Sequence, residues 1–293
     1  MEPTFLTAVL LPAALGVIML GLGLTLTPAD FRRVVEFPRA VVVGLACQML
    51  LLPAVCFAIA KGMGLPPDLA IGLMLLAASP GGATANLFSH LAHGDVALNI
   101  TLTAVNSVLS LLTLPFIVNF ALVQFVGEGK MIPLQFGKVV QMFLVVLIPV
   151  AIGMTLRGKK PDLAARLEKR VRLVSALALG LVILGAVLKE RSRILEGLQL
   201  IGAASLVFNL TSMAIGYFVP LAARLPRRQA IAIGMEIGIH NSALAITVAS
   251  SPLLLNNSTM AIPAAVYSVI MVFTAAGFGW LANRRADPAK AAT

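Results

Sequence analysis

The chain has 293 residues, of which 59% are hydrophobic and only 12% are charged. A soluble domain of this length would need more polar residues to cover its surface, so the composition excludes an ordinary soluble protein and predicts an all-α polytopic membrane protein. The net charge of +10 could suggest a nucleic-acid partner. However, the basic residues lie between apolar runs, where they act as topology signals, and no nucleic acid is expected.

Nine apolar runs are long enough to be membrane-spanning helices. We expect them at residues 5–26, 38–60, 67–91, 95–124, 133–156, 171–188, 196–220, 228–250 and 260–281. The first run lacks a basic leader and a small-residue cleavage site, so it is interpreted as a span rather than a signal peptide. Cys47 and Cys56 share the second run and are interpreted as small buried hydrophobes.

The loops between the runs predict the orientation. Nine spans place the termini on opposite sides of the membrane, and most of the 22 basic residues fall on the side of the C-terminus. The positive-inside rule therefore predicts an outer N-terminus and a cytoplasmic C-terminus in the cell (inner) membrane. The charged loop 157–172 is interpreted as an orientation-setting connector between two halves. The basic loop 189–196 runs against the rule, although Glu190 and Glu196 partly offset its charge.

Two of the predicted spans carry signals for a break. The third contains Ser79-Pro80-Gly81-Gly82 at mid-membrane, where proline removes a helix donor and the glycines loosen the backbone. The eighth carries a weaker signal at 238–242, where polar side chains cluster. Each broken span is the last but one of its half of the chain. Paired interruptions of this kind indicate an inverted-repeat transporter with its site near the midplane.

One acid lies in the second of these broken spans. Of the 12 acidic residues, only Glu236 lies well inside an apolar run. A carboxylate at that depth is costly, so it is by default a hypothesis for a functional site. Gln48 is also deep in the second run, and Asn86 follows the first break.

Further polar side chains recur in the fourth span. Asn99, Thr103 and Asn106 have the spacing of one helical face. Carboxylate, amide and hydroxyl oxygens together form the ligand set of a hard cation such as Na⁺. A broken helix adds free carbonyls for that cation and free N–H groups for an anion. The pattern therefore predicts a cation and an anionic substrate held side by side.

Each feature also has a simpler explanation. The buried amides could serve only as hydrogen-bonding glue between helices. Pro80 could be a packing kink, and Thr103 could bond only to its own backbone. His240 could be a satisfied core histidine, and Glu236 a protonated buried carboxyl. The prediction of a site depends on the whole set and on no single member.

At these residues the sequence resembles the bile acid:sodium symporter family. The resemblance is carried by SPGGATANLFSHLAHGDVALNITLTAVNSVLS, which begins at Ser79, and by EIGIHNSALA, which begins at Glu236. GLGLTLTPADF near the start and Gln48 before LLPA also match. The resemblance covers nearly the whole chain, as a single transporter domain of residues 1–293. It implies a nine-span form with a panel domain (about 5–26 and 133–188) and a core domain (about 38–124 and 196–281).

The resemblance also implies two sodium sites that share Glu236. Asn86, Thr103 and Glu236 match ligands of the first site, and Asn99 stands where many members have serine. Ala85 stands where a bacterial pattern has a ligating serine, so one hydroxyl is missing. The implied ligands of the second site are Gln48, Glu236, the carbonyls of Ile237 and Ile239, and His240, which stands in place of the family's usual glutamine.

The substrate is expected in the cavity between core and panel, near the starts of the two half-helices. The implied substrate-binding residues are Gly82, Ala83, Thr84, Asn241 and Ser242. We expect a sodium-coupled symporter of an organic anion, such as a bile-acid-like, pantothenate-like or keto-acid substrate, that works by alternating access. No catalytic residue and no cofactor are expected beyond Na⁺, and a monomer is the simplest state.

Three alternatives stay open. His240 could bind a proton where family members bind sodium, which would give proton or mixed coupling. An intramembrane enzyme could use Glu236, His240 and Ser242, but the sequence has no G-x-S-x-G or H-E-x-x-H motif. A passive channel or an ion-binding sensor would show flux without coupling, or binding without flux.

Overall fold

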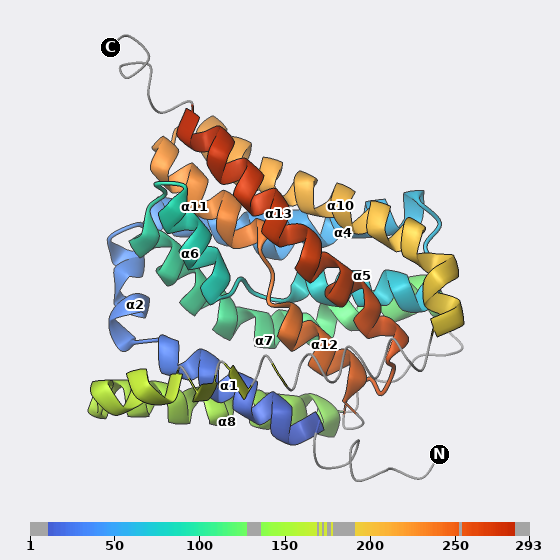
Figure 1. Cartoon of the computed structure of the whole chain (residues 1–293), viewed down its shortest axis with the longest axis horizontal. Helices are drawn as coiled ribbons and strands as arrows, with labels where there is room; N and C mark the ends of the chain where they lie inside the picture. The colour runs from blue at the N-terminus through green and yellow to red at the C-terminus, as the bar shows by residue number, and fades with distance from the viewer. Residues whose placement is uncertain are drawn as a thin grey trace.

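The computed structural model describes residues 11–127, 136–168, 170–171, 173–174, 177, 191–251 and 254–284. These residues are helical, joined by short connections, with one isolated β-bridge (Figure 1). The elements are α1 (Leu11–Thr25), α2 (Pro28–Arg32), η2 (Arg33–Val35), α3 (Pro38–Ala46), η3 (Cys47–Leu51), α4 (Leu52–Gly62), α5 (Pro67–Ala78), α6 (Ala83–Leu91), α7 (Val96–Val126), α8 (Phe136–Lys159), α10 (Arg191–Ala222), α11 (Arg227–Gly238), α12 (Ser242–Ser250), η5 (Thr259–Ala261) and α13 (Ile262–Arg284). The expectation of an all-helical protein is therefore confirmed for the described residues.

Several of these elements are long enough to cross a membrane. Within the described ranges, three stretches qualify by length and hydropathy: Pro38–Gly62, Gln199–Ala222 and Thr259–Arg284. The helix α7 bends by 58° between Ser110 and Leu112, and it makes a fourth if its two halves are counted as one span. Pro115 follows closely, and a proline removes a hydrogen bond from the preceding turn. Most of the predicted sixth span, 171–188, lies outside the described residues.

Prolines set the starts of the second and third spans and the distortion of the second. Pro38 and Pro67 stand in the first turns of α3 and α5, where a missing N–H costs nothing. Pro53, by contrast, interrupts a continuous span and follows the π-helical turn η3. A π-turn is a common accommodation for a lost backbone bond and often marks a functional site. Gln48 lies in this turn and is buried.

The third and eighth predicted spans are both broken, as expected. The helix α5 ends at Ala78 and α6 begins at Ala83, while α11 ends at Gly238 and α12 begins at Ser242. The two unwound segments cross and pair with each other. Gly81 and His240 form an antiparallel bridge, and the Asn241 N–H donates to the Pro80 carbonyl at 2.8 Å.

The two broken helices run in opposite directions. At one end of the molecule, the N–H of Asp95, just after α6, donates to the carbonyl of Arg228 at the start of α11 at 2.9 Å. At the other end, Asn257, beyond α12, donates to the carboxylate of Asp68 at the start of α5 at 3.1 Å. Four half-helix ends therefore meet at the crossing, two of them amino ends and two carboxyl ends.

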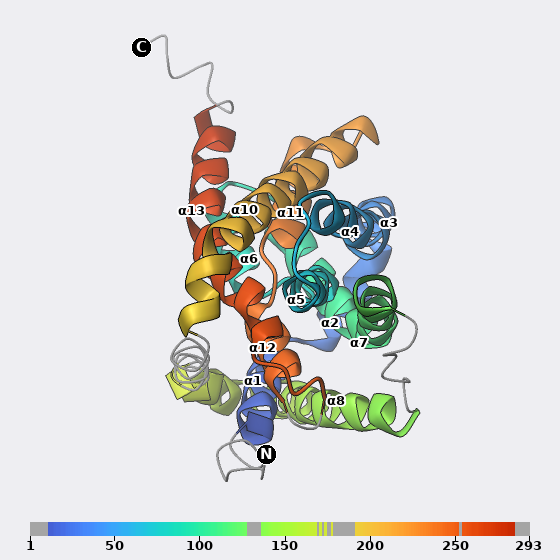
Figure 2. The same ribbon diagram turned by 90° about the vertical axis from the view of Figure 1, so that its right-hand side faces the viewer.

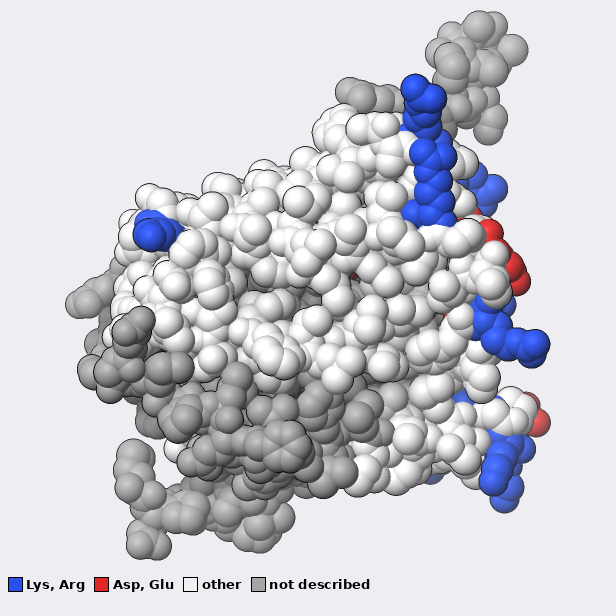
Figure 3. All heavy atoms as spheres, turned by 180° about the vertical axis from the view of Figure 1, so that it is seen from behind, with Lys and Arg blue, Asp and Glu red and all other residues white. Residues whose placement is uncertain are grey.

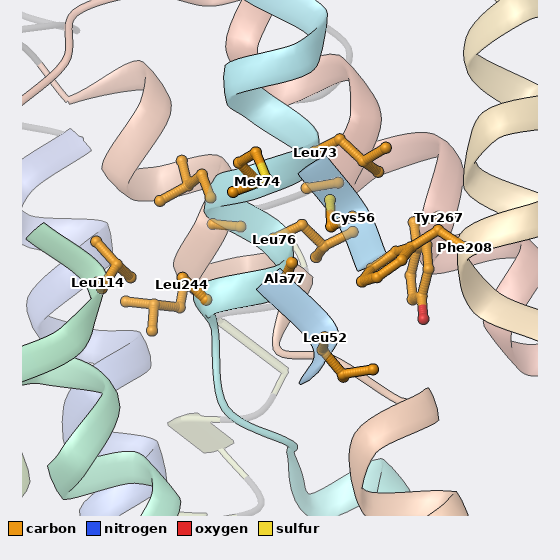
Figure 4. Close-up of a cluster of buried hydrophobic side chains, with 14 of the residues drawn as sticks. Leu52, Cys56, Leu73, Met74, Leu76, Ala77, Leu114, Phe208, Leu244 and Tyr267 are labelled. Carbon is orange, nitrogen blue, oxygen red and sulfur yellow. The ribbon is translucent and has the colours of Figure 1, made fainter. Parts of the chain in front are cut away.

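The hydrophobic core surrounds the first half-helix of the third span. Residues 69–78 of α5 are all buried. Figure 4 shows Cys56 from α4 beside Leu73 and Leu76 and Leu52 below Ala77, with Phe208 and Tyr267 approaching from α10 and α13. Cys47 and Cys56 are both buried and free, which confirms their interpretation as small hydrophobes. This packing fixes the level at which α5 ends.

The helices α1 and α8 form a pair along the lower edge of the molecule (Figures 1 and 2). Glycines let their backbones touch. A Cβ built on Gly153 would come within 2.7 Å of the Gly23 carbonyl carbon, and a Cβ on Gly23 would overlap the Val150 backbone. Close approach of this kind is typical of helix pairs in membranes.

Charge is distributed unevenly over the surface. Lys and Arg gather at one end of the face seen in Figure 3, and the middle of that face is almost bare of charge. Large apolar side chains are exposed on the surface, including Phe116 at 71% and Phe273 at 73% exposure. In water such a surface would be a liability, but in a bilayer it is the expected lipid-facing belt.

Candidate functional site

Glu236 lies at the crossing of the two broken helices and is only 1% exposed. The Thr103 hydroxyl, from α7, donates to its Oε2 at 2.6 Å, while Oε1 has no hydrogen-bond partner. Gly81 lies flat against the carboxylate, and any Cβ at that position would overlap both oxygens. A side chain at position 81 would therefore displace the acid, which is why the crossing needs glycine there.

Two amides near this carboxylate have unpaired oxygens, and a third unpaired amide oxygen lies in α6. Asn99 donates through Nδ2 to the Ala232 carbonyl at 2.7 Å, which leaves its Oδ1 without a partner. Asn106 lies beside Glu236, yet neither of its amide atoms completes a hydrogen bond. Asn86 in α6 also has an unpaired, buried Oδ1. Leaving a buried polar atom unpaired costs about 1–3 kcal/mol, so a set of such oxygens needs an explanation.

A second group lies on the other side of the unwound segment. Gln48 donates through Nε2 to the carbonyls of Ala77 and Ser79, at 3.2 and 3.0 Å, and its Oε1 stays unpaired. His240 Nδ1 lies 3.2 Å from the same Ser79 carbonyl, and its Nε2 has no partner. The imidazole stacks on Phe208 with ring centroids 5.7 Å apart. The simpler interpretation of His240, a fully satisfied core histidine, therefore holds for only one of its two nitrogens.

Two functional candidates were missed by the sequence reasoning. Asn209 of α10 donates through Nδ2 to the Gly238 carbonyl and to the Tyr267 hydroxyl, both at 2.8 Å. The Tyr267 hydroxyl in turn donates to the Gly238 carbonyl at 2.9 Å. This triangle, which we call the α11 clamp, holds the last residue of α11 where the helix unwinds. The signals available in the sequence were an amide inside an apolar run and one of only two tyrosines.

The predicted substrate residues lie at the starts of the two second half-helices. Gly82 precedes α6 in an extended conformation, and Thr84 is exposed. Asn241 caps α12 by accepting from the Leu244 N–H at 3.0 Å, and the Ser242 hydroxyl is buried and unpaired. The side chain of Ala83 lies outside the described part of the chain. Helix amino ends attract anions, so two of them at one crossing favour a negatively charged ligand.

The structure brings the predicted residues together to different degrees. Thr103 and Glu236 are in direct contact, and Asn99 contacts the backbone of α11 beside them. Ile237 and Ile239 are buried where α11 unwinds, on the two sides of Gly238. Ala85 is fully buried and brings no polar atom. In the described residues no hydrogen bond links Gln48 or Asn86 to Glu236.

The donor set fits sodium. It consists of a carboxylate, amide oxygens, a hydroxyl and the ends of unwound helices, which are all hard oxygen ligands. In the part of the chain that the structure describes, no group of three or more His, Cys, Asp or Glu could hold a metal ion. A dehydrated alkali cation needs oxygen ligands in place of its water. The unpaired oxygens of Glu236, Asn99, Asn106 and Asn86 are ligands of this kind.

Two oppositely directed broken helices that cross at a buried carboxylate inside a polytopic membrane protein define a secondary transporter. Residues 12–197 match the Sodium Bile acid symporter family, so the chain belongs to that family. It is a sodium-coupled solute cotransporter and not an enzyme.

The sequences of curated relatives align with most of this chain. An uncharacterized sodium-dependent transporter, YocS, of Bacillus subtilis is 28% identical over 87% of this chain and 77% of its own length. A probable chloroplastic sodium/metabolite cotransporter, BASS2, of rice is 29% identical over 98% of this chain and 67% of its own. The rabbit ileal sodium/bile acid cotransporter is 23% identical over 80% and 67%.

Proposed function

We propose that this protein is a symporter that uses the sodium gradient to import a small or amphipathic organic anion by alternating access. The observation that carries the proposal is the set of unpaired, buried oxygens around Glu236 at the crossing. Without a cation these oxygens are destabilising, and with one they become ligands. The ion then neutralises the carboxylate and braces two helices that otherwise meet through a few backbone contacts.

Two cations share the carboxylate in this proposal. The first is held by Asn86, Asn99, Thr103 and Glu236, with Asn106 added because its amide is unpaired beside the acid. The second is held by Glu236 and by four further ligands. These are Gln48, the carbonyls of Ile237 and Ile239, and His240. The absence of a hydroxyl at Ala85 leaves the first site with one ligand fewer.

The substrate binds next to the crossing. Its anionic group lies at the amino ends of α6 and α12, near Gly82, Ala83, Thr84, Asn241 and Ser242. The neighbouring cations reinforce the attraction of the helix ends, so sodium and anion raise each other's affinity. This reciprocity is the physical basis of coupling. Bile-acid-like, pantothenate-like and keto-acid substrates all fit this chemistry.

The larger architecture follows the family pattern. Nine spans form an inverted-repeat core, about 38–124 and 196–281, and a panel, about 5–26 and 133–188. The α1–α8 pair, held by glycine contacts apart from the crossing, supports the division. Movement of the core against the panel alternates access. The basic end of the molecule, seen in Figure 3, supports a cytoplasmic C-terminus and an outer N-terminus in the cell membrane.

A second candidate is proton or mixed coupling through His240. It is favoured by the unpaired Nε2 of that residue at the crossing. Uptake into proteoliposomes under separate sodium and proton gradients distinguishes the two. Drive by a proton gradient alone that disappears in His240→Gln would establish the second candidate. Drive by sodium alone, unchanged in that variant, would exclude it.

The direct test of the main proposal uses Glu236→Gln. We expect this variant to insert normally and to lose sodium-driven uptake. Glu36→Gln, which removes one exposed negative charge at the surface, is the matched control and should transport as the wild type does. The substrate is first identified by a thermal-shift screen of organic acids with and without sodium, because coupled ligands stabilise the native state together. Wild-type uptake by Glu236→Gln would rule out the assigned role.

A further inference from the structure

A groove runs between α10 and α13 on the outside of the molecule. Its volume is about 410 Å³. The lining side chains are almost all apolar, and they include Leu210, Tyr217, Phe218, Thr274, Phe278 and Leu281. Leu210 is 51% exposed and Phe218 60% exposed, so the groove opens toward the surroundings. Gly277 widens it, because a Cβ at that position would meet no atom within 4 Å.

Cationic side chains lie at one end of this groove, and none is among the described residues that line it. Arg284 at the end of α13 lies over the ring of Trp280, 3.8 Å from its centroid. Arg224 follows α10 and is exposed. Arg227 donates to the Ala282 carbonyl at 2.5 Å. In the described residues none of these three arginines has a carboxylate partner.

The dimensions match one leaflet of a bilayer. The lining residues of α13 extend from Thr274 to Ala282, which is about 12 Å along a helix. Half of a hydrocarbon core is about 15 Å. The groove is thus apolar through one leaflet and cationic where that leaflet meets water. This charge distribution is complementary to a phospholipid that has a negative headgroup and an acyl chain.

We propose that the α10–α13 groove binds an anionic phospholipid, with an acyl chain along Gly277 and Phe278 and the phosphate at Arg224 and Arg284. A second copy of the chain is a poorer occupant. Copies in one membrane share one orientation, so a symmetric pair would bring the two basic ends together. A lipid instead supplies the missing negative charge.

The groove is connected to the second broken helix. A Cβ on Gly234 of α11 would lie 3.4 Å from Phe278, and a Cβ on Gly238 would overlap Met213. Met213 and Phe278 both line the groove. A chain that packs against these residues therefore supports the helix that carries Glu236. Occupancy should stabilise the folded transporter and should not change which ion it binds.

The test measures thermal unfolding of the purified full-length protein in detergent, with added phosphatidylglycerol or phosphatidylcholine. We expect phosphatidylglycerol to raise the Tm by a few degrees and phosphatidylcholine to have little effect. Gly277→Leu fills the groove and should abolish the shift. Gly202→Leu, at a site in α10 where a Cβ also meets nothing within 4 Å, is the matched control and should keep it.

A second pair of variants tests the headgroup. Arg224→Gln with Arg284→Gln should remove most of the phosphatidylglycerol shift, because both side chains are exposed and their loss leaves the fold intact. Lys61→Gln at the opposite end is the charge control and should keep the shift. Three results would each overturn the proposal: an equal shift with phosphatidylcholine, an equal shift with inorganic phosphate, or a full shift in Gly277→Leu. A dimer that dissociates in Gly277→Leu would identify a second copy as the occupant and would likewise overturn it.

Discussion

Gly81→Ala is the substitution that most directly tests how the crossing positions its carboxylate. A methyl group at position 81 would overlap the carboxyl carbon and both oxygens of Glu236. The acid would have to turn away, and the 2.6 Å hydrogen bond from Thr103 would be lost. Backbone movement offers little relief, because Gly81 is bridged to His240 and the neighbouring Pro80 carbonyl accepts from Asn241.

The size of the effect follows from these two losses. Overpacking a tight site costs about 1–3 kcal/mol, and a hydrogen bond to a charged group contributes about 1.5–3 kcal/mol. The overpacking penalty and the loss of the hydrogen bond do not add in full, because turning the carboxylate away breaks the hydrogen bond but relieves the overlap. A penalty of about 2–3 kcal/mol on the binding geometry raises the apparent sodium Kd roughly 30- to 150-fold.

The assay is a sodium titration of the Tm in detergent, with potassium replacing sodium at constant ionic strength. Sodium raises the Tm of the wild type by mass action, and the midpoint of the rise reports its affinity. Gly82→Ala is the matched control for sodium binding, since it makes the same change one residue later, where a Cβ meets nothing within 4 Å. A Gly81→Ala titration that overlays the wild type would refute the argument that close packing positions the carboxylate.

Three further substitutions probe the surroundings of the site. Tyr267→Phe removes the hydroxyl that donates to the Gly238 carbonyl. Because such a hydrogen bond contributes about 1 kcal/mol, sodium affinity should fall about fivefold in the same titration. An unchanged affinity would remove the α11 clamp from the mechanism. Gly216→Ala places a Cβ 2.7 Å from a side chain of α11 and should cost about 1–3 kcal/mol of stability, whereas Gly202→Ala in the same helix should be neutral or stabilising in thermal unfolding. His240→Gln should retain sodium-driven uptake in proteoliposomes. Loss of uptake in this variant would show that the imidazole itself holds the coupling ion.

Much of the fold could be predicted because its signals are local. Length and hydropathy indicate membrane helices, and the predicted limits at 38, 67, 91 and 250 coincide with observed helix ends. The break at 79–82 was predictable from proline and glycine chemistry. The buried acid stood out because no other carboxylate lies inside an apolar run. Each of these inferences needs only neighbouring residues and the cost of placing them in a bilayer.

The residues of the candidate site could be selected from the sequence, but their contacts could not. Glu236, Thr103 and Asn99 could be selected by type and depth, with the family resemblance assigning roles. That Asn99 would use its amide nitrogen on the Ala232 carbonyl and leave its oxygen free could not be predicted. Asn209 and Tyr267 carry no local signal that separates them from ordinary packing residues. Their role depends on a carbonyl in another helix.

What the sequence determined by itself was that this chain inserts as helices, that two of those helices break, and that one of the broken helices carries a costly acid. The tertiary structure alone decided that the two breaks meet, that glycine at position 81 leaves space for the carboxylate, and that the oxygens around it stay unpaired. The physical reason is range. Helix formation and bilayer burial depend on neighbouring residues, whereas the crossing joins segments about 160 positions apart, and only packing of the whole bundle brings them together.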